Sequence, residues 1–382
     1  MVLKLCSRCL SEWHTNERTV NVLLLNSAHG KYPVCSEGWI QATLRAIHHL
    51  SSQGVEIICS TEPVSWDIVT YLAGISGMHT RFIVKTGDIQ NGQKEFSASL
   101  EDFALDPQKV KPVFLPEEEI LSHSHPRDSW PKRDRLALQS ADVVYPISIR
   151  PGGRLENMMN EAPYRKKICD DFRIPWTPYG FIPRYSLAGR PWNPLPKGEW
   201  LVHWTRTCPG KWPGEKSCEF YHDLLKNNTV YVRNAGETLS RIIREQKIRG
   251  SDWKTPGNVH LSAFTALDPG DALALMCWRK CYGRYSFEPF GIGVQKEALL
   301  ALGVQKVNYT FGGETINSDR AFTHAAGDQG HWVWESEWRV LGDVSLGVIS
   351  RKDITAIVPD RFAARNLKRK IPADFPVHIL FE

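Results

Sequence analysis

The stretch VNVLLLN, residues 20–26, most constrains what this chain can fold into. A continuous apolar run of this length predicts a strand buried on both faces, as in a parallel sheet covered by helices. Further runs of this kind at 55–60 and 80–87 are separated by segments with helical spacing at 36–54 and 65–74. The alternation of strand and helix predicts an α/β domain with a doubly wound parallel sheet.

The first domain should extend well beyond these elements. Residues 88–111 are polar and weakly patterned, which predicts a surface excursion. A short helix is expected from residue 130, and ADVVYPISI at 141–149 predicts another buried strand. The sequence RPGGRL follows directly and should form a tight loop that opens into a helix.

This loop is a candidate phosphate site. Gly152 and Gly153 would let the backbone approach a phosphate closely, and Arg150 and Arg154 add positive charge. Ser27 lies in the turn after the first strand, and open parallel sheets bind ligands at the carboxyl ends of their strands. We therefore expect these five residues to sense a nucleotide; an ordinary strand-to-helix turn is the alternative.

Residues 20–165 resemble the SLOG superfamily, the Rossmann-like group of DprA-type DNA-processing proteins and LOG-type nucleotide phosphoribohydrolases. The resemblance rests on NSAHG after the first strand, on the Arg-Asp pair of the short helix and on ADVVYPISIRPGG. The sequence PGGRLENMMNE lacks the second glycine and the threonine of the LOG enzymes. The resemblance therefore implies nucleotide sensing in a Rossmann-like domain more than nucleotide hydrolysis.

The proline-rich stretch 173–198 divides the chain, because each proline fixes φ and removes a hydrogen-bond donor. Its interleaved aromatic residues favour an ordered connector over a hinge. The expected segments are an N-terminal extension, a nucleotide-binding domain, this linker and a second domain, with bounds 1–19, 20–172, 173–198 and 199–382.

Strands and helices alternate unevenly in the second half. Strands are predicted at 199–205, 257–265, 305–311, 331–341 and 349–360, helices at 235–252 and 268–283, and a strand turning into a helix at 290–303. This pattern predicts an α+β domain with a mixed or antiparallel sheet.

The segment HWVWESEWRVL, 331–341, carries two candidate catalytic carboxylates. On a strand, Glu335, Glu337 and Arg339 would share one face, while Trp334 and Trp338 would share the other and pack in the core. A solvated face neutralised by Arg339 is the alternative interpretation.

Two other strands each place polar side chains on one face. His203 and Thr205 share a face of the first, and His260 and Ser262 share a face of the second. A strand with His, a strand with Ser and a final Glu strand, in this order, resemble the ADP-ribosyltransferase fold over residues 199–360. Within it, HWT and the helix LSRIIREQKIRG are similar to DarT-type toxins, and the W…YG…GIG…VNY…ESEWR layout is similar to abortive-infection-associated families.

The resemblance implies that NAD is the substrate. Glu337 would stabilise the oxocarbenium-like state as nicotinamide leaves, and Glu335 would serve as an acid–base residue. His203 and Thr205 would hold the adenosine ribose and nicotinamide, while Ser262 would brace the site.

The helix end supplies further candidates, since Arg249 and Lys254 would meet the diphosphate. Metal ligation is less favoured: Cys6 and Cys9 form a single C-x-x-C, and Cys277 and Cys281 are interpreted as buried thiols on an apolar helix.

Bulk composition places few limits on function. The net charge of +5 is small for a dedicated nucleic-acid binder, and nine scattered cysteines favour the cytoplasm. No apolar run is long enough to span a membrane.

The preferred hypothesis is an NAD-using transferase or glycohydrolase coupled to a nucleotide sensor, as in a bacterial toxin or anti-phage defence protein. Its acceptor would be protein, nucleic acid or water, and a homo-oligomer is compatible. The alternatives are a non-catalytic, DprA-like DNA or nucleotide binder and a LOG-like phosphoribohydrolase.

Overall fold

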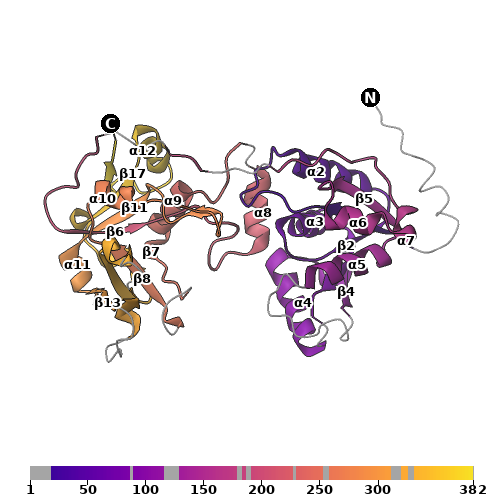
Figure 1. Cartoon of the computed structure of the whole chain (residues 1–382), viewed down its shortest axis with the longest axis horizontal. Coiled ribbons are helices and arrows are strands. Elements are labelled where there is room, and N and C mark those ends of the chain that lie inside the picture. Colours follow the sequence, from indigo (N-terminus) through magenta and orange to yellow (C-terminus); the bar gives the residue numbers. More distant parts are fainter. Residues whose placement is uncertain are drawn as a thin grey trace. The chain divides into compact units, whose positions relative to one another are not determined.

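The computed structural model describes residues 19–86, 89–115, 129–178, 183–185, 191–226, 229–252, 258–310, 320–325 and 331–381. The chain divides into two compact units, each built around its own sheet (Figure 1). The first unit comprises 1–182 and 210–232, and the second 183–209 and 233–382. Lys254, Cys6 and Cys9 lie outside the described residues.

A five-stranded parallel sheet forms the centre of the first unit, in the order β4-β3-β2-β1-β5. Its strands are β1 (Asn21–Asn26), β2 (Glu56–Cys59), β3 (His79–Val84), β4 (Val110–Phe114) and β5 (Val143–Ser148). Its helices are α2 (Gly38–Leu50), α3 (Val64–Ile75), α4 (Ile89–Phe103), α5 (Trp130–Ser140), α6 (Arg154–Met159), α7 (Ala162–Arg165) and α8 (Ser217–Lys226).

Both faces of this sheet are buried, as the apolar runs predicted. Val22 and Leu24 of β1 join a core with residues of α2 and α3, whereas Leu23 and Leu25 join a second core with residues of α5 and α6. Successive side chains of β1 therefore pack in two different cores, one on each face of the sheet, which confirms the α/β class.

Two expectations about the extent of the first unit were wrong. Residues 88–111 are not a surface excursion but contain α4 and the start of the edge strand β4. Phe96, Leu100 and Phe103, on one face of α4, pack with the core. In addition, residues 210–232, which the sequence placed in the second domain, carry α8 and belong to the first unit.

The second unit is α+β, as expected, with a seven-stranded mixed sheet in the order β12-β15-β8-β6-β11-β17-β18. Its strands are β12 (Gln305–Lys306), β15 (Glu337–Leu341), β8 (Leu261–Thr265), β6 (Trp200–Trp204), β11 (Gly291–Gln295), β17 (Ile354–Val358) and β18 (Val377–Ile379). Neighbouring strands are antiparallel except for β17 and β18.

Helices and small ribbons complete this unit. The helices are α9 (Ala235–Glu245), α10 (Pro269–Ala274), α11 (Lys296–Leu300) and α12 (Arg361–Lys368). The ribbons pair β9 (Trp278–Arg279) with β10 (Arg284–Tyr285), β13 (Asn308–Thr310) with β14 (Thr323–Ala325), and β16 (Val344–Ser345) with β7 (Lys247–Ile248). The main core lies between one sheet face and the side chains of α9, α11 and α12.

Three predicted elements of the second unit are shorter than expected. The helix expected at 235–252 ends at Glu245, where Gln246 adopts a left-handed conformation. The helix expected at 268–283 ends at Ala274, and a hairpin follows, so Cys277 and Cys281 are exposed thiols and not buried ones.

The strand expected at 331–341 begins only at Glu337. Residues His331–Glu335 form a 3₁₀ helix, and Ser336 turns the chain with φ of 45°. Trp334 is consequently 70% exposed, which corrects its assignment to the core, whereas Trp338 packs against the main core.

Candidate functional site

The strand order of the first sheet places its switch point between β1 and β5. The chain adds β2, β3 and β4 on one side of β1 and then returns to β5 on the other side. Ligands of open parallel sheets bind outside the carboxyl ends of the two strands at such a point. The residues that follow β1 and β5 therefore line the candidate site, which we call the β1/β5 crevice.

The two loops of this crevice are joined by hydrogen bonds. The Ser27 N–H donates to the Ser148 carbonyl over 2.9 Å, and the Arg150 N–H donates to Ser27 Oγ over 2.8 Å. The sequence-predicted residues Ser27 and Arg150 thus lie together, on loops that are far apart in the chain.

The glycine loop next to them already holds a negatively charged group. Gly152 has φ of 66°, and its N–H donates to Glu156 Oε2 over 2.7 Å. Gly153 approaches Arg150 so closely that a Cβ would lie 2.9 Å from the Arg150 carbonyl oxygen. The backbone amide of this loop is therefore directed at an anion, here the carboxylate of Glu156.

Buried polar atoms without partners lie at the ends of both strands. Asn26 Nδ2 donates to Thr43 Oγ1 over 3.2 Å, but Asn26 Oδ1 has no partner among the described residues. Ser148 Oγ also has no partner among them. Asn26 is 5% exposed and Ser148 is 1% exposed. Buried polar groups are nearly always hydrogen-bonded, so these atoms are suited to a polar ligand or bound water.

Aromatic rings border the crevice. His29 stacks on Trp39 with ring centroids 4.5 Å apart, and the Arg150 guanidinium lies 5.5 Å from the Trp176 ring centre. Burial lowers the pKa of His29 to about 4, although the backbone of Thr177 opposes the shift. His29 is therefore a neutral imidazole near pH 7.

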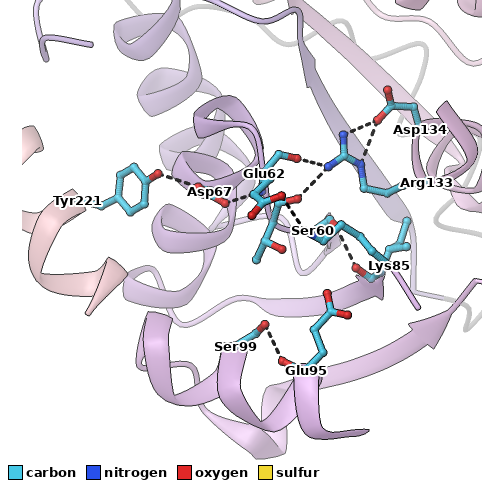
Figure 2. Close-up of polar contacts among 11 residues, drawn as sticks. Ser60, Glu62, Asp67, Lys85, Glu95, Ser99, Arg133, Asp134 and Tyr221 are labelled. Carbon is cyan, nitrogen blue, oxygen red and sulfur yellow. Dashed lines mark hydrogen bonds and ion pairs between the residues drawn. The ribbon is translucent and has the colours of Figure 1, made fainter. Parts of the chain in front are cut away.

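A buried arginine, Arg133, contacts the turn after β2 and Asp134 (Figure 2), and Asp134 also binds Arg154 of the glycine loop. Arg154 Nη2 binds Asp134 Oδ2 over 2.9 Å, and Asp134 Oδ1 accepts from Arg133 Nε and Nη2 over 3.1 and 2.8 Å. Arg133, only 1% exposed, also donates to the carbonyls of Thr61 and Glu62. Arg154, a predicted site residue, is thus held at the same edge of the sheet.

Asp67 extends the network to α8. Its Oδ1 accepts the Glu62 N–H over 2.7 Å, and its Oδ2 accepts the Tyr221 hydroxyl over 2.8 Å. Burial raises the pKa of Asp67 to about 6, and these two hydrogen bonds oppose the rise. Sequence reasoning missed Glu62 and Asp67; the available signal was the polar segment STEP directly after a buried strand.

In the second unit, the three strands that carry the transferase-like motifs are neighbours, in the order β15-β8-β6. Glu337 pairs with Thr265, and Thr265 pairs with Val202. Directly paired residues share a sheet face, so Glu337 lies on the face of Val202. His203, the next residue, lies on the opposite face, with its ring 5.7 Å from that of Phe264.

The expected constellation is therefore split between the two faces of the sheet. Ser262 pairs with Val340, a residue of the main core, and lies on the same face as His203. The expectation that Glu337, His203 and Ser262 surround one site is wrong for this arrangement. Chain order could identify the strands but not the face that each side chain occupies.

The side chains that the sequence assigned to NAD binding all contact other groups of the protein. Thr205 Oγ1 lies 3.1 Å from the Ala235 carbonyl oxygen and 3.0 Å from the Phe290 carbonyl oxygen, and Ser262 Oγ donates to the Gly342 carbonyl over 2.8 Å. Arg249 is exposed and pairs with Glu245. His203 Nδ1 lies 2.8 Å from the Ala263 carbonyl oxygen, and burial lowers the pKa of His203.

Glu335 and Glu337 lie in a polar cluster of their own. Arg339 Nε and Nη2 each lie 2.9 Å from an oxygen of Glu337, and Tyr309 Oη accepts the Glu337 N–H over 3.3 Å. Arg279 Nη2 lies 4.0 Å from Glu335 Oε1. Burial raises the pKa of Glu335, and the charge of Glu337 adds to the rise.

A pocket of about 300 Å³ lies near this end of the sheet. Trp200, Trp338 and Lys296 line it together with Ala266, Leu267 and Asp268. The Lys296 ammonium lies 5.1 Å from the Trp338 ring centre, and the buried Trp338 Nε1 has no partner among the described residues. No pattern in the sequence predicted this pocket.

Comparisons with protein-family models, with curated proteins and with solved structures found no match to this chain. Among the described residues, no three or more His, Cys, Asp or Glu side chains are grouped so that they could hold a metal ion. No helix in this part of the chain has the length and apolar character needed to cross a bilayer.

Proposed function

We propose that the first unit binds a nucleotide at the β1/β5 crevice, as a sensor of the SLOG and Rossmann-like type. The observation that carries this proposal is the coincidence of three features at the switch point. These are the Ser27–Arg150 junction, the anion-directed amide of Gly152 and the partnerless Asn26 Oδ1 and Ser148 Oγ. The partnerless atoms offer polar contacts for a nucleotide, and its phosphate would replace the Glu156 carboxylate at the Gly152 amide.

Calorimetric titration tests this proposal. The ligands are the ribonucleoside 5′-monophosphates and 5′-triphosphates, with inorganic phosphate and single- and double-stranded DNA in parallel. We expect at least one nucleotide to bind, and Ser27→Ala or Arg150→Ala to weaken it about tenfold or more. Arg45→Ala is the matched control, because Arg45 is exposed in the middle of α2.

Two results would refute the nucleotide site. The first is the absence of nucleotide binding by the wild-type chain. The second is an equal effect of Arg45→Ala and Arg150→Ala, which would reflect net charge alone. Binding of DNA but not of nucleotides, with a steep dependence on salt, would favour the DprA-like alternative.

NAD cleavage by the second unit, as an ADP-ribosyltransferase-like effector, is a second candidate function. It is supported by the neighbouring strands β6, β8 and β15 and by the carboxylates of Glu335 and Glu337. A carboxyl group whose pKa is raised by burial is suited to proton transfer, and a second carboxylate can stabilise a developing cation. We assign these roles to Glu335 and Glu337, and His203 has no contact with them in this arrangement.

Nicotinamide release from NAD, with and without nucleotides and DNA, tests the second candidate. We expect Glu337→Gln to abolish release and Glu335→Gln to shift its pH dependence. Glu297→Gln, an exposed position on α11, is the control. Release that survives Glu337→Gln, or its absence under every condition, would exclude the transferase function.

A further inference from the structure

The ends of four neighbouring strands line the pocket of the second unit. The strands β15, β8, β6 and β11 run antiparallel in this order, so the starts of β6 and β15 lie at the same sheet edge as the ends of β8 and β11. Trp200 begins β6, Trp338 is the second residue of β15, and Lys296 directly follows β11. With a volume of about 300 Å³, the pocket is in the size range of small-molecule sites.

Apolar side chains and three charged groups line this pocket. The charged groups are Glu199, Asp268 and Lys296, so the lining contains one more carboxylate than ammonium groups. The apolar side chains are those of Leu195, Pro196, Trp200, Leu201, Ala266, Leu267 and Trp338. Indole rings and an excess of carboxylates favour a positively charged ligand.

The pocket already holds one ammonium group. Lys296 Nζ lies 2.7 Å from Glu199 Oε2 and 5.1 Å from the centre of the Trp338 ring. The face of an indole ring attracts an ammonium group within about 6 Å, and the carboxylate adds a charge attraction. Lys296 therefore occupies a cation position that consists of an aromatic face and a carboxylate.

Asp268 supplies a second carboxylate, which is not paired with a cation. It is exposed, and its side chain makes no hydrogen bond or ion pair with another described residue. Trp200 lines the same pocket, and its Nε1 donates to the Pro196 carbonyl over 2.7 Å, which fixes the ring. A carboxylate and an indole ring, the two kinds of group that hold Lys296, are thus present a second time.

We propose that this pocket binds a small organic cation, whose ammonium group pairs with Asp268 and packs against the indole rings, and that Lys296 competes with this ligand. The lining shows through Lys296 that it can hold an ammonium group. A small anion is disfavoured, because Glu199 already pairs with Lys296 and Asp268 would repel the anion. The site is independent of both functions proposed above.

The test compares three probes of similar shape by saturation-transfer NMR titration of the full chain. Benzylamine is a cation near pH 7, benzyl alcohol is neutral and benzoate is an anion. Wild type should bind benzylamine about threefold or more tighter than the other two probes, and Asp268→Asn should remove most of this preference. Asp271→Asn, at an exposed position of α10 outside the pocket lining, is the matched control and should leave the preference unchanged.

Lys296→Met provides a second measurement, for which a cation site and an anion site predict opposite effects. Methionine keeps an unbranched side chain but no longer occupies Glu199 and the Trp338 face with an ammonium group. Benzylamine should therefore bind about threefold or more tighter to this variant than to wild type. Lys352→Met, at an exposed position outside the lining, controls for the loss of one positive charge.

Three results would overturn the proposal. A preference for benzoate that Lys296→Met abolishes would make the pocket an anion site. Equal effects of Asp268→Asn and Asp271→Asn on benzylamine binding would reflect attraction to the surface charge alone. The absence of benzylamine binding to both wild type and Lys296→Met would refute an ammonium site in this pocket.

Discussion

Asp67→Asn should change how the stability of the first unit depends on pH. The pKa of Asp67 is raised from 3.8 to about 6 by burial, so the folded state holds this proton more tightly than the unfolded chain does. The stability that the protonated carboxyl contributes is therefore complete below about pH 3.8 and is lost as pH rises through about 6. Asparagine is uncharged at every pH, so the variant does not lose this stability as the pH rises.

The magnitude follows from the raised pKa. A difference of about 2 pKa units corresponds to about 3 kcal/mol of unfolding free energy, since each unit is worth about 1.4 kcal/mol. This is an upper bound, because Asp67 keeps some access to solvent. Asp67→Asn also keeps an acceptor for the Glu62 N–H, and the Tyr221 hydroxyl can accept from the new amide.

Urea unfolding between pH 4.5 and 8, followed by hydrogen exchange in β1 and β5, reads the first unit separately. The stability of Asp67→Asn relative to wild type should rise with pH and level off above about pH 7. Glu62, Lys85 and Arg133, the charged groups that interact with Asp67, are present in both proteins. Asp171→Asn, at an exposed position, is the control. Parallel pH profiles for wild type and Asp67→Asn would refute the reasoning.

Two further predictions concern buried and exposed side chains. Arg133→Met should lower the unfolding free energy by about 3–5 kcal/mol, because it leaves the buried Asp134 without its main partner; urea titration measures this, and a loss below about 1 kcal/mol would contradict it. Peptide mapping after brief thiol labelling should find Cys277 and Cys281 modified and Cys59 protected, since Cys59 is buried and burial raises its pKa to about 12. Equal labelling of all three would contradict the exposed hairpin.

The sequence predicted the parallel sheet well because its signals are local. The apolar runs that became β1, β2 and β5 are buried on both faces, so no alternation was needed to find them. The edge strand β4 was missed since Pro112 and exposed Lys111 make it unlike a central strand. Helix α4 is polar overall and shows its core-facing side only through Phe96, Leu100 and Phe103.

The candidate sites were also predicted in part: the sequence placed some of their residues together correctly and others wrongly. Ser27 and Arg150 could be assigned together because the carboxyl ends of parallel strands always meet at one edge. His203 and Glu337 could not, because the side-chain face depends on register, and a shift of one residue reverses it. Alternation also failed at Ser336, where a left-handed residue ends the 3₁₀ helix before β15 begins.

The placement of α8 has a consequence for how this protein could have been assembled during evolution. The chain passes from one unit to the other three times, at 182–183, 209–210 and 232–233. Tyr221 and Phe220 of α8 complete the core of the first unit, so a gene segment ending at residue 182 would encode an incomplete fold. Each unit is built from two separate stretches of the chain, so a single crossover cannot exchange one unit for another. A simple fusion of two genes would instead place all of one unit before all of the other. The first unit therefore depends on a segment that the chain reaches only after it has entered the second unit.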